Sequence, residues 1–234
     1  MDVILIPGLW LDGASWDAVL PALRDAGHRP HPVTLPGMES RSADRSAIGL
    51  RDHVDAVVAL IDSLDGSPAV VGHSGGGAVA HAAVDARPGR VSHAVYVDCW
   101  PVGDGDAINT GLPADGADLP LPDWSFFDDE DLVDLDDELR ARFRARAVPS
   151  PARVASDPQR LTDERRLDVP VTIVACEFPS GSLREWMAAG EPRLRELSRI
   201  RQVAYTDLPT GHWPQFTRPA ELGRAIAGAL PDWS

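Results

Sequence analysis

Residues 69–78, Ala-Val-Val-Gly-His-Ser-Gly-Gly-Gly-Ala, decide the fold. The apolar residues 69–72 predict a buried strand, and the small residues that follow predict a helix over 76–87. The serine between them has a glycine two residues away on either side, which is the G-x-S-x-G pattern of a nucleophile elbow. Such a turn strains the backbone of Ser74 and projects its hydroxyl group, while a side chain at Gly72 or Gly76 would collide with neighbouring backbone. The pattern predicts Ser74 as a nucleophile, with the N–H of Gly75 at the helix start placed to stabilise an oxyanion.

Strands and helices alternate on both sides of this turn. Short apolar runs bounded by Gly, Pro or Asp predict six strands, at 2–6, 31–35, 69–72, 93–98, 169–175 and 202–206. The stretches between them predict helices at 15–26, 48–64, 76–87, 182–198 and 219–230. This alternation predicts an α/β fold with a mostly parallel sheet of about six strands and helices on both faces.

The segment 99–168 interrupts the alternation. It holds 17 acidic residues and eight arginines, and prolines break it into short pieces. Trp124, Phe126, Phe127 and Phe143 are interspersed with these charges, a pattern typical of short amphipathic helices that cover an apolar surface. We therefore expect a core of residues 1–98 and 169–234 with an inserted lid at 99–168; a poorly ordered acidic linker is the alternative.

Composition excludes several classes of protein. The 234 residues are enough for one sizeable core, and 22 basic residues, all arginine, against 36 acidic ones give a net charge of -14. That balance argues against nucleic acid or an anionic membrane as a partner. No apolar run approaches the roughly 18 residues of a membrane span, and no signal sequence precedes the first strand, so we expect a cytoplasmic protein. Cys99 and Cys176 are expected to be buried thiols, and the sequence gives no indication of oligomeric state.

A serine hydroxyl needs a general base within hydrogen-bonding reach. His212 lies in Thr-Gly-His-Trp-Pro, residues 210–214, between the last predicted strand and the last helix. The order serine, acid, histidine along the chain fits a hydrolase elbow, and so His212 is the candidate base. A structural histidine in a loop is the alternative. The spacing of the other histidines forms no recognisable metal motif, and no metal site is expected.

The chain resembles the α/β-hydrolase superfamily from end to end. Besides the elbow, the first strand ends in Ile-Pro-Gly-Leu-Trp, residues 6–10, followed by Gly-Ala-Ser-Trp at 13–16 and Thr-Leu-Pro-Gly at 34–37. The likeness is to the small plant-type esterase and hydroxynitrile lyase branch and to bacterial esterase-like relatives. Pro7 stands where relatives usually have histidine. The resemblance implies an α/β-hydrolase fold and assigns the N–H of Leu9 as the second oxyanion donor.

The acid of the expected catalytic triad is ambiguous in the sequence. Most relatives place it a few residues after the strand 169–175, where this chain has Pro179, which cannot orient an imidazole. Asp98, at the end of the strand 93–98, is the favoured acid, because some branches of the superfamily carry it there. Glu177 is the alternative acid, and Asp207 is a third candidate. Asp98 could also merely cap the strand end.

Aromatic residues predict the character of the substrate pocket. Trp10, Trp100, Trp124 and Trp213, together with Phe178, fall in loops at the carboxyl ends of strands or in the expected lid. They are candidate substrate-binding residues for an apolar or aromatic acyl or alcohol group, although aromatic residues also fill cores. An acidic lid near the mouth would favour neutral or cationic esters.

Together these features predict a serine hydrolase that cleaves a small carboxylic ester or lactone through an acyl-enzyme, without cofactor or metal. A hydroxynitrile-lyase-like C–C lyase on the same scaffold is a rival, disfavoured because typical plant lyases place a lysine near the site and this chain has none. A ligand sensor that retains the elbow without catalysis is a second rival.

Overall fold

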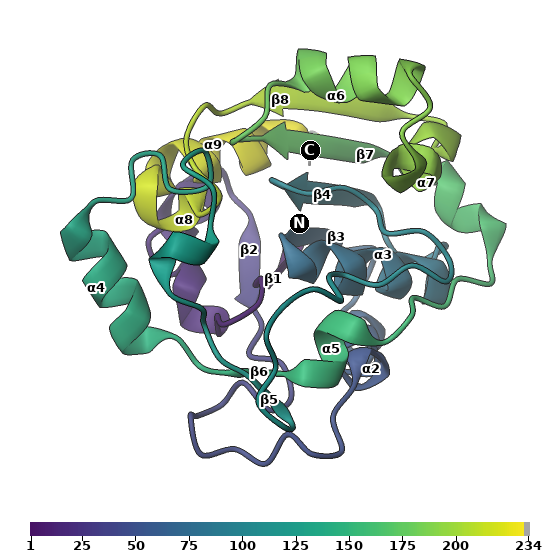
Figure 1. The fold of residues 1–234 in the computed structure, drawn as a ribbon. Helices are drawn as coiled ribbons and strands as arrows, with labels where there is room; N and C mark the ends of the chain where they lie inside the picture. Colours follow the sequence, from purple (N-terminus) through teal and green to yellow (C-terminus); the bar gives the residue numbers. More distant parts are fainter. Residues whose placement is uncertain (232–234) are drawn as a thin grey trace.

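The computed structural model describes residues 1–231 and contains one six-stranded sheet (Figure 1). Its strands lie in the order β2-β1-β3-β4-β7-β8, and every neighbouring pair is parallel. Their bounds are β1 Asp2–Ile6, β2 Arg29–Pro32, β3 Ala69–His73, β4 His93–Val97, β7 Val171–Ala175 and β8 Val203–Asp207. The four inner strands are buried along their whole length, which explains their nearly continuous apolar sequences.

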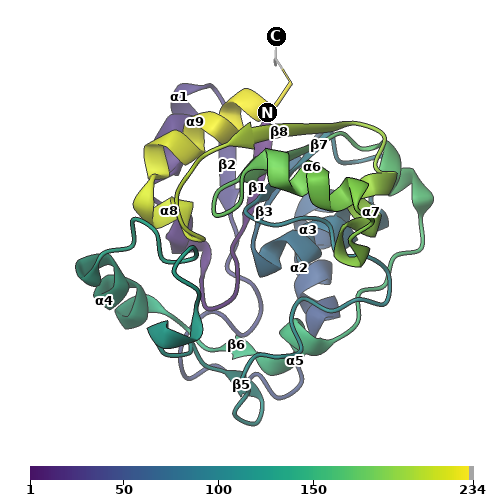
Figure 2. The ribbon, with the colours of Figure 1, turned by 45° about the horizontal axis from the view of Figure 1, so that its top comes forward.

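Helices cover both faces of this sheet, and the predicted fold class is therefore confirmed. On one face α2 (Leu50–Ser63) and α3 (Gly75–Ala86) pack against strand residues such as Ile4 and Val70. On the other face α1 (Leu20–Asp25) and α9 (Pro219–Ala229) lie side by side and pack against Val3 and Val71, as Figure 2 shows. Successive strand residues thus enter opposite cores. None of the helices in the described part of the chain has the length and apolar character that a membrane crossing requires.

Some predicted elements are shorter or divided in the structure. The expected helix 15–26 is a 3-10 turn at Gly13–Trp16 followed by α1, and the expected helix 182–198 is divided into α6 (Ser180–Ala188), a 3-10 turn at Pro192–Leu194 and α7 (Arg195–Arg199). Gly190, with φ +79°, and Pro192 explain this second break, because a left-handed residue followed by a proline cannot continue a helix. A short α8 (Pro214–Thr217) precedes α9.

Residues 99–168, here called the inserted segment, form an ordered layer of short elements. These are β5 Asp118–Leu119, a 3-10 turn at Trp124–Phe126, α4 Asp137–Arg146, β6 Ser150–Pro151, α5 Ala152–Ser156 and a 3-10 turn at Glu164–Asp168. Strands β5 and β6 form an antiparallel pair, seen at the lower edge of Figure 1. Phe143 packs with Trp213 in a separate hydrophobic cluster, and Val154 joins the main core. The segment is thus packed onto the sheet domain; its role as a lid with boundaries at 99 and 168 stays a prediction.

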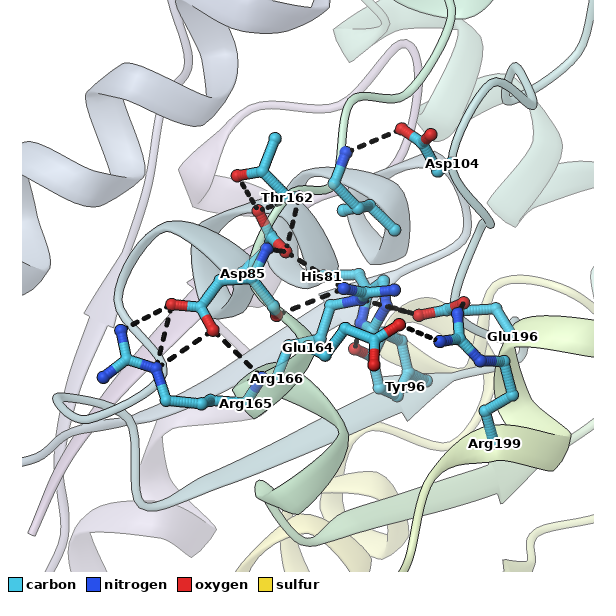
Figure 3. A network of polar contacts seen from close by, with 12 residues as sticks. His81, Asp85, Tyr96, Asp104, Thr162, Glu164, Arg165, Arg166, Glu196 and Arg199 are labelled. Carbon is cyan, nitrogen blue, oxygen red and sulfur yellow. Dashed lines mark hydrogen bonds and ion pairs between the residues drawn. The ribbon is translucent and has the colours of Figure 1, made fainter.

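A buried ionic network anchors the end of the inserted segment (Figure 3). Asp85 on α3 accepts hydrogen bonds from the backbone N–H groups of Thr162 and Asp163. The Arg166 guanidinium joins Asp85, at 3.3 Å, to Glu196 on α7, at 2.7 Å. The side chains of all three charged residues are at most 6% exposed. Each buried charge is therefore compensated by an ionic partner that arrives from another part of the chain.

Replacing Arg166 by alanine should strongly destabilise the protein, by about 3–5 kcal/mol, because Asp85 and Glu196 would then be buried without their shared cation. Urea unfolding followed by circular dichroism measures the loss. Arg165→Ala is the matched control, since Arg165 is exposed and, within the part of the chain that the structure describes, pairs with Asp163 alone. Equal unfolding midpoints for the two variants would contradict this role of Arg166.

Candidate active site

Ser74 occupies a strained turn between β3 and α3. Its φ of 51° and ψ of -125° are unusual for a residue with a side chain, and its N–H donates to the carbonyl of Val97 on β4. A Cβ at Gly72 would lie 2.6 Å from the carbonyl oxygen of Gly76, and one at Gly76 would lie 2.7 Å from that of Ile6. Only glycine fits at both positions, so the turn can approach the end of β1 closely.

Ser74, His212 and Asp98 form a continuous hydrogen-bonded series. The Oγ of Ser74 lies 2.7 Å from His212 Nε2, and His212 Nδ1 lies 2.7 Å from Asp98 Oδ2. His212 comes from the loop after β8, whereas Asp98 follows β4 with φ +49°. Because a carboxylate only accepts, Nδ1 carries the hydrogen in this pair, and Nε2 is left to accept the proton of Ser74.

Asp98 is held rigidly by the backbone. Its Oδ1 accepts from the N–H groups of Cys176 and Glu177, at 2.9 and 3.0 Å, and its side chain is fully buried. The other two candidate acids lie differently. Glu177 Oε2 is 3.3 Å from His212 Nδ1, whereas Asp207 accepts from the backbone and hydroxyl of Ser180 at the start of α6. Asp98 is therefore the carboxylate with the shortest contact to the imidazole.

The two residues proposed as oxyanion donors, Leu9 and Gly75, belong to neighbouring turns that contact each other. Gly75 is the first residue of α3, where an N–H has no carbonyl one turn earlier to bond. A Cβ at Gly75 would lie 3.1 Å from the Cγ of Leu9, and one at Gly8 would lie 3.0 Å from the Cβ of Ser74. The Gly8-Leu9 turn is therefore packed directly against the nucleophile turn.

A small pocket opens beside these turns. Gly8, Leu9 and Gly75 line it on one side, and its apolar wall consists of Leu11, Leu35, Met38, Val79 and Val154. His53 and Ser150 are its polar neighbours. None of these wall residues stands out in the sequence, although the Leu-Pro-Gly turn at 35–37 marks the loop that carries two of them.

The tryptophans predicted to bind substrate do not line this pocket. Trp10, Trp124 and Trp213 pack in one aromatic cluster, in which the rings of Trp124 and Trp213 are 5.8 Å apart. Trp213 is only 1% exposed. Trp100 lies apart from them, with its ring 5.6 Å from that of Phe178. Their role in substrate binding stays a prediction.

His73 supports the loop that carries His212. Its Nε2 lies 2.7 Å from the carbonyl oxygen of His212, to which it donates, and its Nδ1 lies 3.2 Å from the amide of Gln215. Burial lowers the pKa of His73 to about 3, with a further contribution from the charge of His212. His73 is thus a neutral donor that fixes the base loop, a role that its place next to the serine did not suggest.

Electrostatics favour the charged form of His212. Burial lowers the pKa of this imidazole, but the hydrogen bond to Asp98 and the negative charges of Asp98 and Glu177 raise it more, so the net shift is upward from 6.5. Within the described residues, Asp98, Glu177 and His212 are also the one group of His, Cys, Asp and Glu side chains close enough to share a metal ion. The Nδ1–H of His212 already bonds Asp98, so hydrogen bonding accounts for this grouping.

The chain belongs to the alpha/beta hydrolase family, whose model matches residues 3–225. It is 30% identical over 112 residues to a carbendazim hydrolyzing esterase of a Nocardioides species, a match that covers 47% of this chain and 46% of the relative. It is also 30% identical over 97 residues to a pyrethroid hydrolase of Sphingobium wenxiniae, covering 41% of this chain and 35% of that protein. Each match therefore spans less than half of the relative's length.

Solved structures share the fold over nearly the whole chain. An extracellular alpha/beta-hydrolase from a Paenibacillus species superposes with a TM-score of 0.76 at 19% identity, covering 99% of this chain and all of the other. A methylesterase from Arabidopsis gives a TM-score of 0.73 at 17% identity, covering 98% of each chain. At such identities the likeness establishes the fold.

The pKa of His212 should lie above 6.5, because two carboxylates stabilise the imidazolium. Replacing Glu177 by glutamine removes one of these charges and should lower this pKa by about one unit. NMR titration of the ring protons, assigned with His212→Gln, measures the shift. Glu185→Gln, which removes an exposed carboxylate from α6, is the control. An unchanged midpoint in Glu177→Gln would contradict the electrostatic contribution of Glu177.

Proposed function

We propose that the protein is a serine hydrolase that cleaves a small carboxylic ester or lactone. The observation that carries this proposal is a pair of 2.7 Å contacts: Ser74 Oγ to His212 Nε2, and His212 Nδ1 to Asp98 Oδ2. Ser74, the proposed nucleophile, lies at a strained turn. The names of the two relatives, an esterase and a hydrolase, support the same class of reaction.

Acyl transfer follows from this geometry. His212 Nε2 takes the proton of Ser74 while Oγ forms a bond to the carbonyl carbon, whose π electrons move onto the oxygen. The N–H groups of Leu9 and Gly75 are the proposed donors to that oxyanion. As the intermediate collapses, the bond to the alcohol oxygen breaks and His212 returns the proton to it. Water activated by the same imidazole then releases the acid and restores Ser74.

Asp98 is the proposed acid of this triad. Both of its oxygen atoms are used, one by two backbone amides and the other by Nδ1, so that the imidazole is held in one tautomer and one orientation. The same contact stabilises the imidazolium that forms when Ser74 attacks. Asp207, bonded to Ser180, is left with the role of anchoring α6.

The pocket supports an apolar substrate group. Its wall of leucine, methionine and valine, next to the proposed oxyanion amides, favours an apolar group over a charged one, and no ionic side chain lines it in the part of the chain that the structure describes. We propose that the inserted segment acts as a lid over this site, since its residues Ser150 and Val154 form part of the pocket. The reaction as proposed needs no cofactor.

A fluorophosphonate probe should label Ser74, and the protein should hydrolyse p-nitrophenyl acetate. Ser74→Ala should abolish both signals, and Asp98→Asn should lower kcat by about two to four powers of ten, because the imidazole loses its charged partner. Mass spectrometry locates the adduct, and initial rates give kcat. Asp207→Asn is the comparison variant and should retain turnover.

Three outcomes would overturn parts of this proposal. A folded protein that the probe does not label would favour a ligand sensor. Cleavage of a cyanohydrin without turnover of any ester would favour the lyase. Full turnover by Asp98→Asn together with a crippled Glu177→Gln would transfer the role of the acid to Glu177.

A further inference from the structure

A second cavity lies where α5 packs against α2, at the lower right of Figure 1. Its volume is about 320 Å³. Pockets that bind small molecules start at about 300 Å³, so this one has room for a small ligand. Among residues 1–231, its lining has no member in common with the pocket beside the Gly8-Leu9 turn, and it includes neither Ser74 nor His212. The cavity is therefore separate from the candidate active site.

The floor of this cavity is apolar. Leu50 and Val54 line it from successive turns of α2, and Ala82 lines it from α3. All three side chains are at most 4% exposed. Pro158 adds an exposed apolar surface nearer the solvent. A ligand in the cavity can therefore place a hydrocarbon body against these side chains.

The mouth of the cavity is basic. Arg51, Arg153 and Arg160 line it, and all three are exposed. Arg51 forms an ion pair with Asp55 on its own helix, and Arg153 pairs with Asp157 at 3.3 Å. Arg160 has no acidic partner among residues 1–231. One guanidinium at the mouth is thus left to bind an anion.

The carboxylate in the lining is already engaged elsewhere. Asp157 Oδ2 accepts from the N–H of Leu50, at the start of α2, as well as from Arg153. A Cβ at Gly49 would collide with this oxygen, so glycine at that position lets the carboxylate approach the helix. Asp157 is therefore held at α2 and Arg153, and it does not neutralise Arg160.

We propose that this cavity binds a small organic carboxylate, with its charged group on Arg160 and its hydrocarbon body on the floor of Leu50, Val54 and Ala82. The planar guanidinium matches a carboxylate through two parallel hydrogen bonds. A single negative charge fits the one unpaired cation, whereas a dianion would place excess negative charge next to Asp55 and Asp157. The inference goes beyond the proposed ester hydrolysis, because the site is separate from Ser74.

Octanoate is the probe, and NMR of the methyl groups of Leu50 and Val54 locates its binding. These methyl signals should shift until they saturate. Octan-1-ol, which has the same body without the charge, and inorganic phosphate, which has a charge without the body, should each bind at least tenfold more weakly. The methyl groups of Leu11 and Val79 report on the pocket near the elbow and should shift less.

Three variants test the role of Arg160. Arg160→Gln should weaken octanoate binding about tenfold, because the carboxylate loses its charged partner. Arg160→Lys should recover part of that loss, since it keeps the charge without the planar fork. Arg24→Gln is the matched control and should bind as the wild type does, because it removes an exposed arginine from α1 on the other face of the sheet. Thermal unfolding verifies that all the variants are folded.

Four outcomes would overturn the proposal. They are the absence of a saturable shift with octanoate, shifts confined to Leu11 and Val79, equal affinity in the wild type and Arg160→Gln, and binding of octan-1-ol or phosphate as tight as that of octanoate. The NMR titration needs no catalysis. A protein that binds octanoate here but is not labelled by fluorophosphonate would therefore refute the proposed function and leave this site intact.

Discussion

The close approach of two backbone turns is the constraint on which the site depends. Strands β1 and β3 are neighbours in register, with Ile6 opposite Gly72, and the chain leaves both at the same edge of the sheet. From β1 the chain continues to β2 on one side of the pair β1–β3, and from β3 it continues to β4 on the other side. The strand order therefore reverses between β1 and β3, and the crossover connections diverge there to leave a crevice. Gly72 and Gly76 have no room for a side chain there. The proposed nucleophile and both proposed oxyanion amides arise from this single packing contact.

The remaining groups reach that point from separate strands. Asp98 follows β4, Glu177 follows β7 and His212 follows β8, so that the three neighbouring strand ends deliver the partners of Ser74. Parallel strands place all of these ends at one edge, which is why Ser74 and His212, 138 positions apart in the chain, form a hydrogen bond there. His73 then ties the histidine loop back to β3 through its carbonyl.

Local sequence predicted the parts of the site that depend on strand ends. The six strands, the elbow and the places of Asp98 and His212 follow from short apolar runs and the residues directly after them. Asp131 lies in an acidic stretch that looks like any solvated charge run, and only tertiary packing brings its backbone carbonyl to the N–H of His212. Trp213 shows a further limit of prediction from sequence. An aromatic residue beside the histidine has the same sequence signal whether it lines a pocket or, as here, packs among other rings with 1% exposure.

The two carboxylates beside His212 are not equivalent, and the reason lies in their backbone support. Asp98 has a short side chain on a strand end, and two amide N–H groups orient it before the imidazole arrives. That preorganisation removes the cost of turning a charge toward the ring during the reaction. Glu177 is longer and partly exposed, and it reaches Nδ1 only at 3.3 Å, with an oxygen atom that no donor from residues 1–231 satisfies. An unsatisfied buried carboxylate is costly unless a proton or cation compensates it. The rigid carboxylate of Asp98 therefore fixes the tautomer of His212, whereas Glu177 adds negative charge beside the same imidazole without orienting it.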